Sequence, residues 1–454
     1  MRRSSDDDSS NAPAPGAGRR GRRLRRRWSP LVTAGVGVLV LAGFGTAGAT
    51  THSRPHAAKG ALDILQITAL TGSESFEANY AASGYFPSLY ALNSAGGILG
   101  HQVKITIVDT RSDPADALTS AQQALATNSN VIGVQGPDTT SAPTLVPLFT
   151  SQKLPMFVTA GQAQYDRNSS PYFWRLLPPD PANGEAMAIW AKKKGYTRIA
   201  AVFGTDPGSQ GDLPGVLDGV RRIHAKLVAN VGLTPDQSSY RSDVAKVLAA
   251  KPQVIMTETD GPTAATFFSE VQQLGALPQV MPDGTTANST YINPVLQAVG
   301  ASTFNKMFTF VSEGSPPNNP ATAALNSALR HVASHLQKPL SQWENNPFTD
   351  AFFDSFVIEG LAATAAKSTN PATINAWITK VTSPGRGKKV VYTYPAGVAA
   401  LKAGKQIQYI GASGVINFNK YHNFYGNQAV QKYSQSKGLV TIANVLASQI
   451  EKLG

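Results

Sequence analysis

Small hydroxyl side chains gather in one loop of this sequence. The loop is Gln135-Gly136-Pro137-Asp138-Thr139-Thr140-Ser141, between an apolar strand-like run at 130–134 and a helix-like run at 141–151. Hydroxyl groups at a helix start lie beside backbone N–H groups that have no partner inside the helix, and together these groups bind carboxylates and other anions. The alternative is ordinary capping of the helix by the same side chains, and both interpretations stay open.

Acidic residues follow two other strand-like runs, and each precedes a glycine. Asp260 follows the run at 253–259, and Asp283 follows the run at 279–281. A carboxylate at such a position can pair with an ammonium group of a ligand, because a buried charge needs a partner. Turn capping before Gly261 and Gly284 is the competing interpretation.

Signals for catalysis are weak. His331 and His335 are spaced as a helical metal pair would be, yet Val332-Ala333-Ser334 between them lacks the glutamate of the zinc-protease motif. No strand is followed by a G-x-S-x-G elbow, a Walker loop or a dinucleotide-binding fingerprint. The chain has no cysteine, which excludes disulfides, thiolate nucleophiles and cysteine-based zinc sites. We therefore predict no enzyme, no metal and no cofactor.

Strand-like and helix-like runs alternate from Leu62 onward, in two consecutive series. The predicted strands are Leu62–Leu70, Val103–Thr110, Asn130–Gly136 and Pro155–Thr159, then Arg198–Thr205, Lys226–Val231, Gln253–Thr259 and Gln279–Met281. Helices are predicted between them, for example at Tyr80–Asn93, Pro114–Ala126 and Gln210–His224. The strands lack clean apolar–polar alternation, as is typical of parallel sheets covered on both faces. The pattern predicts an α/β protein with two doubly wound, Rossmann-like lobes.

The first part of the chain has a different character. Residues 1–28 hold nine arginines and three aspartates, and therefore half of the formal net charge of +12. An uncharged, largely apolar segment follows at 29–53, with the small-residue run Ala47-Gly48-Ala49 near its end. A basic region, an apolar region and a small-residue site together predict an export signal, either cleaved or kept as a membrane anchor. The remaining chain has no clustered aromatic–basic stripe that would indicate nucleic-acid binding.

Two motifs, far apart and in order, carry a family resemblance. The first comprises Asn93-Ser94-Ala95-Gly96-Gly97-Ile98-Leu99-Gly100 and, after the next strand, Asp109 to Asp113-Pro114 and Ala117. The second is Tyr409-Ile410-Gly411-Ala412-Ser413-Gly414-Val415-Ile416-Asn417-Phe418. Both resemble the type I periplasmic solute-binding proteins of ABC transporters, among them the leucine/isoleucine/valine-binding proteins. This resemblance covers about residues 62–445 and implies two lobes joined by a multi-strand hinge, with 62–180 and 312–405 in lobe 1 and 181–311 and 406–454 in lobe 2.

The resemblance also implies a ligand site. In the branched-chain amino acid binders, two loops of the first lobe hold the ligand carboxylate, and they match Thr139, Thr140, Ala160 and Gln162 here. The second lobe would provide Ser209, Asp260 and Asp283, with Asp283 nearest the family's acidic position. The family's tyrosines near 208–209 and 260–261 are absent from this sequence. Phe76 or Tyr165 would have to supply an aromatic wall instead.

The implied function is the extracytoplasmic solute-binding component of an ABC importer. It would bind a small polar solute, an amino acid or an amide-like compound, in a cleft that closes by a hinge. Its partners would be the solute and the membrane permease subunits, with membrane contact through residues 29–53 if they are not cleaved. Two alternatives stay open: a ligand-sensing domain of the same fold without transport, and a secreted α/β hydrolase, which would need a nucleophile beside a histidine.

Overall fold

The fold is taken from a computed structural model that describes residues 60–72, 75, 77–206, 208–314 and 318–453. The predicted basic region and export segment, residues 1–53, lie outside the described residues. None of the described helices combines the length and apolar character required to cross a membrane.

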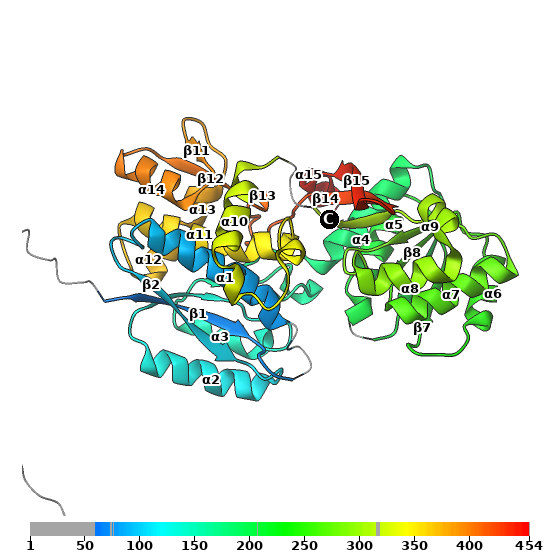
Figure 1. The fold of residues 1–454 in the computed structure, drawn as a ribbon, viewed down its shortest axis with the longest axis horizontal. Helices are drawn as coiled ribbons and strands as arrows, with labels where there is room; N and C mark the ends of the chain where they lie inside the picture. Colours follow the sequence, from blue (N-terminus) through cyan, green and yellow to red (C-terminus); the bar gives the residue numbers. More distant parts are fainter. Residues whose placement is uncertain (1–59, 73–74, 76, 207, 315–317, 454) are drawn as a thin grey trace, which may run out of the picture. The chain divides into compact units, whose positions relative to one another are not determined.

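The first parallel sheet is built from the first predicted series of strands. Its order is β2-β1-β3-β4-β5, and all pairs are parallel. The strands are β1 (Leu62–Thr68), β2 (Val103–Asp109), β3 (Val131–Gln135), β4 (Met156–Phe157) and β5 (Phe173–Trp174). Helices α2 (Pro114–Thr127) and α3 (Ala142–Ser151) cover one face, and α1 (Glu77–Ser94) and α11 (Pro347–Ala366) cover the other (Figure 1). Leu65 and Ile64 of β1 are accordingly buried in different cores, as expected for a strand covered on both faces.

The second parallel sheet repeats this plan with the order β7-β6-β8-β9. Its strands are β6 (Arg198–Gly204), β7 (Lys226–Leu233), β8 (Val254–Glu258) and β9 (Gln279–Pro282). The helices α4 (Asp180–Lys193) and α5 (Leu213–Arg222) share a core with one face. The helices α6 (Arg241–Ala249), α7 (Gly261–Leu274) and α8 (Ser289–Val299) share a core with the other. We refer to the parts of the chain packed around these two sheets as the first and the second lobe.

Two smaller sheets complete the fold. β10 (Phe310–Glu313), β14 (Gln428–Ser434) and β15 (Gly438–Val445) form an antiparallel sheet in the order β10-β14-β15, which packs into the cores of the second lobe. β11 (Lys389–Val391), β12 (Ile407–Gly411) and β13 (Gly414–Val415) form the other, which packs into the first lobe. Within the described residues, the chain passes between a core of the first lobe and a core of the second lobe at three places. They lie between Leu176 and Ala182, between Val311 and Leu325, and between Phe424 and Val430.

The remaining helices are short or lie in the last third of the chain. They are α9 (Ala301–Met307), α10 (Pro320–His331), α12 (Pro371–Asn375), α13 (Ile378–Thr382), α14 (Tyr394–Lys402) and α15 (Ala447–Leu453), with one-turn 3₁₀ helices at Ala163–Tyr165, Gly208–Gln210, Ala333–His335 and Leu340–Gln342.

Local sequence signals around β2 act as predicted. Gly96 and Gly97 have φ of 91° and 72° directly after α1, a conformation that glycine adopts without strain. Asp113 caps α2 by accepting hydrogen bonds from the backbone N–H groups of Ala115 and Asp116, and Pro114 is the first helical residue. The helix end, strand and helix start are therefore where the spacing of these residues placed them.

Two predictions about the last third need correction. The helix predicted at 321–335 ends at His331, so His331 and His335 do not share one helical face; each ring stacks instead on an aromatic ring of α1, Tyr90 and Phe86. Residues 406–424, assigned to lobe 2, pack with the first lobe because Tyr409 and Phe418 join the core that contains α11. The hairpin β14–β15 had no prediction.

The packing of α4 against α5 depends on a glycine. A Cβ added to Gly215 would lie 1.9 Å from the carbonyl oxygen of Pro181, a backbone atom that has no room to move. We expect Gly215→Ala to destabilise the protein by about 1–3 kcal/mol through overpacking. Chemical unfolding followed by circular dichroism measures this loss. Gly426→Ala, whose Cβ would meet no atom nearer than 3.4 Å, is the matched control, and equal stability of the two variants would contradict the expectation.

Candidate functional site

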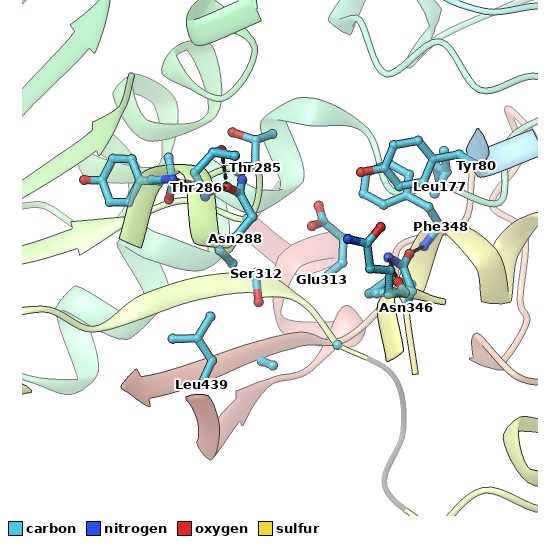
Figure 2. A pocket seen from close by; sticks show the side chains of 18 of the residues that line it. Tyr80, Leu177, Thr285, Thr286, Asn288, Ser312, Glu313, Asn346, Phe348 and Leu439 are labelled. Atoms are coloured by element: carbon cyan, nitrogen blue, oxygen red, sulfur yellow. Dashed lines mark hydrogen bonds between the residues drawn. The ribbon is translucent and has the colours of Figure 1, made fainter. Parts of the chain in front are cut away.

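One large cavity lies where strands of both parallel sheets end. Its volume is about 1080 Å³, and both lobes contribute to its lining (Figure 2). In the first lobe Thr68 ends β1 and Thr159 follows β4; in the second, Glu258 ends β8 and Gly284 follows β9. Loops at the carboxyl ends of parallel strands form the ligand-binding crevice in sheets of this kind. The volume suits a small organic molecule.

The charged residues that line the cavity are all acidic. They are Glu77, Glu258, Asp260, Glu313 and Glu344, and no lysine, arginine or histidine is found among the described lining residues. Like charges around a concave surface reinforce one another's field. The cavity therefore favours a solute with a positive charge.

Glu258 forms the centre of this acidic wall because it is the last residue of a buried strand. Its side chain is only 3% exposed. The hydroxyl of Thr285, in the loop after β9, lies 3.0 Å from Glu258 Oε1 and 2.6 Å from Asp283 Oδ2. The backbone N–H of Asp212, just before α5, donates to Glu258 Oε2 at 3.3 Å. Three segments distant in the sequence are thus joined at this carboxyl group.

Glu313 stands beside this group at the end of β10. A Cβ on Gly284 would lie 2.4 Å from Glu313 Oε2, so the carboxylate packs directly against the backbone of this glycine. Figure 2 shows the Glu313 carboxylate directed into the space between the labelled lining residues.

Burial raises the pKa of every carboxyl group in this cluster. It raises the pKa of Glu313 to about 7 and that of Asp180, on α4, to about 6. Burial and the neighbouring acids also raise the pKa values of Glu258, Asp212 and, to a lesser extent, Asp283, which Thr285 and Thr286 counteract by hydrogen bonding. The described ion pairs include none of these five groups, and Arg175 only partly counteracts the raised pKa of Asp180.

Asp212, Glu258 and Asp283 could in principle hold a metal ion, because one oxygen of each lies within 4.8 Å of the others. Carboxylate oxygens are the ligands that hard divalent cations prefer. However, Glu258 and Asp283 already accept or share hydrogen bonds with Thr285 and with backbone N–H groups. We assign the cluster no metal.

The loop predicted to bind an anion is occupied by a side chain of the protein. Asp138, which is 1% exposed, accepts hydrogen bonds from the backbone N–H and the hydroxyl of Ser141 at 2.8 and 2.6 Å, at the start of α3. The Asp138 carboxylate therefore occupies the helix start at which the sequence predicted the carboxylate of a ligand. Thr139 and Thr140 are not among the described residues that line the cavity, and their contact with a solute stays a prediction.

A buried arginine forms hydrogen bonds with the backbone of the loop at 160–162. Arg175, which is 0% exposed, donates through Nη1 to the carbonyl oxygens of Ala160, Gly161 and Gln162 at 3.1–3.3 Å. The Gln162 amide donates to the carbonyl of Thr139 at 3.3 Å, which joins the two loops predicted to hold a ligand carboxylate. Neither Ala160 nor Gln162 lines the cavity among the described residues.

Of the three second-lobe candidates, two line the cavity and one does not. Ser209 and Asp260 line the cavity, and Asp260 also caps α7 by accepting from the backbone N–H of Thr263 at 2.8 Å. Asp283 is fully buried behind the lining, where it accepts hydrogen bonds from the backbone N–H groups of Thr285 and Thr286. Its direct contact with a ligand stays a prediction.

Aromatic side chains reach the cavity from positions that the sequence did not indicate. Tyr80 of α1 and Phe348 of α11 lie together on the first-lobe side, with ring centroids 5.3 Å apart (Figure 2). Tyr165 instead stacks on Phe173 inside a core of the first lobe. Phe76 lies outside the described residues.

Sequence reasoning also missed the two central acids, Glu258 and Glu313. Each is the last residue of an apolar strand and could have been noticed as such. The sequence instead indicated Asp260, two residues after Glu258, because an Asp-Gly pair is a stronger local signal of a turn.

Comparisons with known proteins agree with this arrangement. A family model described as periplasmic binding protein matches residues 62–393. A curated relative, glutamate receptor 2.4 of Arabidopsis thaliana, is 22% identical over 179 residues, which is 38% of this chain; the match spans about a fifth of that receptor's length, 20%.

Solved structures show the same fold at low identity. A leucine binding protein, LivK, from Thermotoga maritima is 17% identical, with a TM-score of 0.62, over 85% of this chain and 99% of that one. A putative branched-chain amino acid ABC transporter protein from Rhodospirillum rubrum is 16% identical, with a TM-score of 0.64, over 84% and 100%. A solute binding protein from R. palustris in complex with benzoate is 15% identical, with a TM-score of 0.60, over 85% and 96%. The predicted two-lobed α/β fold of the type I periplasmic binding proteins is confirmed.

Proposed function

Since this chain belongs to the periplasmic binding protein family, we propose that it is the extracytoplasmic solute-binding component of an ABC importer. Its solute is a small polar molecule that carries a protonated amine, and amino acids are one class of such molecules. The observation that carries this proposal is the cavity at the strand ends of both lobes, whose charged lining residues are all acidic.

The acidic wall sets the orientation of the solute. An ammonium group beside Glu258 and Glu313 would form charge-assisted hydrogen bonds with their carboxylates. Tyr80 and Phe348 offer apolar and aromatic surface to the rest of the molecule. Contacts from both lobes at once favour a closed arrangement of the lobes, which permease subunits would recognise.

A thermal-shift screen of the exported part of the chain tests the proposal. The panel contains amino acids, amides, urea, simple amines and aromatic acids; a solute that binds the folded state raises the melting temperature by mass action. We expect amine-bearing compounds to raise it and aromatic acids to leave it unchanged. A panel in which only acids stabilise the protein would refute the proposal.

The variant Glu313→Gln tests whether Glu313 binds the amine of the solute. It removes one charged partner, so we expect binding of the best amine to weaken by about ten- to a hundredfold, from the loss of a charge-assisted hydrogen bond. Calorimetric titration measures the change. Asp218→Asn serves as the matched control, because Asp218 is paired with Arg221 and Arg222 on the surface of the same lobe. An affinity that is the same in both variants would remove Glu313 from the site.

The similarity to a plant glutamate receptor favours a second candidate, a ligand-sensing domain of the same fold. Both candidates bind a solute in the same cavity, and they differ in the partner. Uptake of the identified amine by cells that lack this protein distinguishes them: uptake falls for an importer component and is unchanged for a sensor.

A further inference from the structure

The bridge between Glu258 and Asp283 contains more acceptors than donors. Thr285 Oγ1 lies within hydrogen-bond distance of Glu258 Oε1 and of Asp283 Oδ2, at 3.0 and 2.6 Å. A hydroxyl group has one proton to donate. The second contact becomes a hydrogen bond only if one carboxyl group carries a proton and donates to the threonine oxygen. Satisfying both contacts at once therefore requires a proton on one of the two carboxyl groups.

The charges around the bridge all act in the same direction. Asp212 faces it from the start of α5 and Asp180 from α4, and Glu313 adds a third negative group from β10. Arg175 reaches this set only through Asp180, and it is already paired with Asp166. Burial, together with the negative charges of Asp283 and Asp180, raises the pKa of Glu258 to about 9, which agrees with a proton retained at neutral pH.

Among the described lining residues, the cavity offers a ligand carboxylate neutral hydroxyl and amide donors, such as those of Thr68, Thr159 and Asn288, and no positive side chain. The helix start predicted to receive an anion is filled by Asp138. A zwitterionic amino acid would bring its carboxylate into an acidic cavity. A molecule with the same ammonium group and no carboxylate avoids that repulsion.

We propose that the solute is a net cation without a carboxylate, an organic amine or guanidine, and that its binding expels the proton shared by Glu258, Thr285 and Asp283. The proton leaves to solvent, Glu258 becomes a carboxylate and the cation takes the place of the proton as its partner. This inference rests on the proposed function and names the solute class and the proton coupling of the same site.

Decarboxylated pairs test the solute class. The wild-type protein is titrated with isoamylamine, cadaverine and agmatine and with their parent amino acids leucine, lysine and arginine, in a calorimeter at pH 7. Each pair has the same side chain and differs in the carboxylate. We expect at least one amine to bind about tenfold or more tightly than its parent. Parents that bind as tightly as their amines would overturn the inference and leave the proposed function standing, whereas failure of all six compounds would overturn both.

Two buffers test the proton. The heat of binding is measured in phosphate and in HEPES, which are not net cations and whose ionisation enthalpies differ, and the difference gives the number of protons released. We expect release of about one proton at pH 7 and an affinity that rises about tenfold per pH unit between pH 6 and 8, as linkage requires for one proton. Equal heats in both buffers would overturn the exchange.

Glu258→Gln locates the proton. The amide is neutral and can donate to Thr285 as the protonated acid does, so the variant keeps the bridge and cannot release a proton. We expect proton release to vanish and amine affinity to fall. Glu359→Gln is the matched control: Glu359 is a fully buried glutamate of α11 in the first lobe, its pKa is raised to about 8 by burial, and it lies outside the cavity lining. Release that persists in Glu258→Gln, or that is lost equally in Glu359→Gln, would contradict the assignment.

Discussion

Arg175→Met is expected to lower the free energy of unfolding by about 3–5 kcal/mol, because it leaves buried polar partners without a cation. The guanidinium of Arg175 is paired with Asp166 and donates to Asn423 Oδ1 at 2.9 Å and to the carbonyl oxygens of the 160–162 loop. No part of Arg175 is exposed. Methionine fills a similar volume and replaces none of these hydrogen bonds.

Urea unfolding of the variant and the wild type measures this loss. Arg330→Met is the control, since Arg330 forms an exposed pair with Glu344 at 2.6 Å and such pairs contribute about 0–1 kcal/mol. The buried variant should also have a melting temperature lower by more than about 5 °C. Losses of the same size in the two variants would show that the Arg175 network has no special structural role.

The stability of the ligand-free protein is expected to fall as the pH rises from 5 to 9. Glu359 is 0% exposed, its Oε2 accepts a hydrogen bond from the Gln135 amide at 3.0 Å, and its Oε1 has no partner. Burial raises the pKa of Glu359 from 4.5 to about 8. Between these values the folded state binds more protons than the unfolded state, so stability is full below pH 4.5 and is lost as the pH passes through 8. The loss from this group is roughly 4 kcal/mol by pH 9.

Glu359→Gln isolates the contribution of this group. The neutral amide has the shape of the protonated acid and does not titrate, so the variant should be more stable than the wild type at pH 9 and similar to it at pH 5. Melting temperatures across this range in several buffers measure the effect. The carboxyl cluster at the cavity titrates in both proteins, and the difference between them therefore reports Glu359 alone. A difference that does not change with pH would contradict a protonated Glu359.

The strands and the helix caps of the two lobes could be predicted from the sequence because their signals are local. Asp113 and Pro114 start α2, and the paired glycines after Asn93 end α1, by interactions within a few residues. The apolar runs of β1, β2, β6 and β8 are dense enough to identify buried strands without knowledge of their neighbours. The hairpin β14–β15 was missed because β14 mixes polar and apolar residues and is held as a strand by its pairing with β10 and β15, which are distant or adjacent partners that no short run identifies.

The candidate site was predicted only in outline. The rule that loops at the carboxyl ends of parallel strands form the crevice pointed to the loops after β8 and β9, and the family resemblance favoured Asp283 over Asp260. Neither was enough to show that Asp283 lies behind the lining, or that Asp138 occupies the helix start intended for a ligand. Both outcomes depend on which hydrogen-bond donors lie nearest in space.

The sequence by itself determined the two series of strands, the direction in which they run and therefore the edge where a ligand would bind, because periodicity, caps and glycines act over short stretches of chain. The tertiary structure alone decided the charge of the cavity. Glu258, Asp283, Asp212 and Glu313 come from four separate segments, and their pKa values are raised because folding brings the carboxyl groups together and removes water from them.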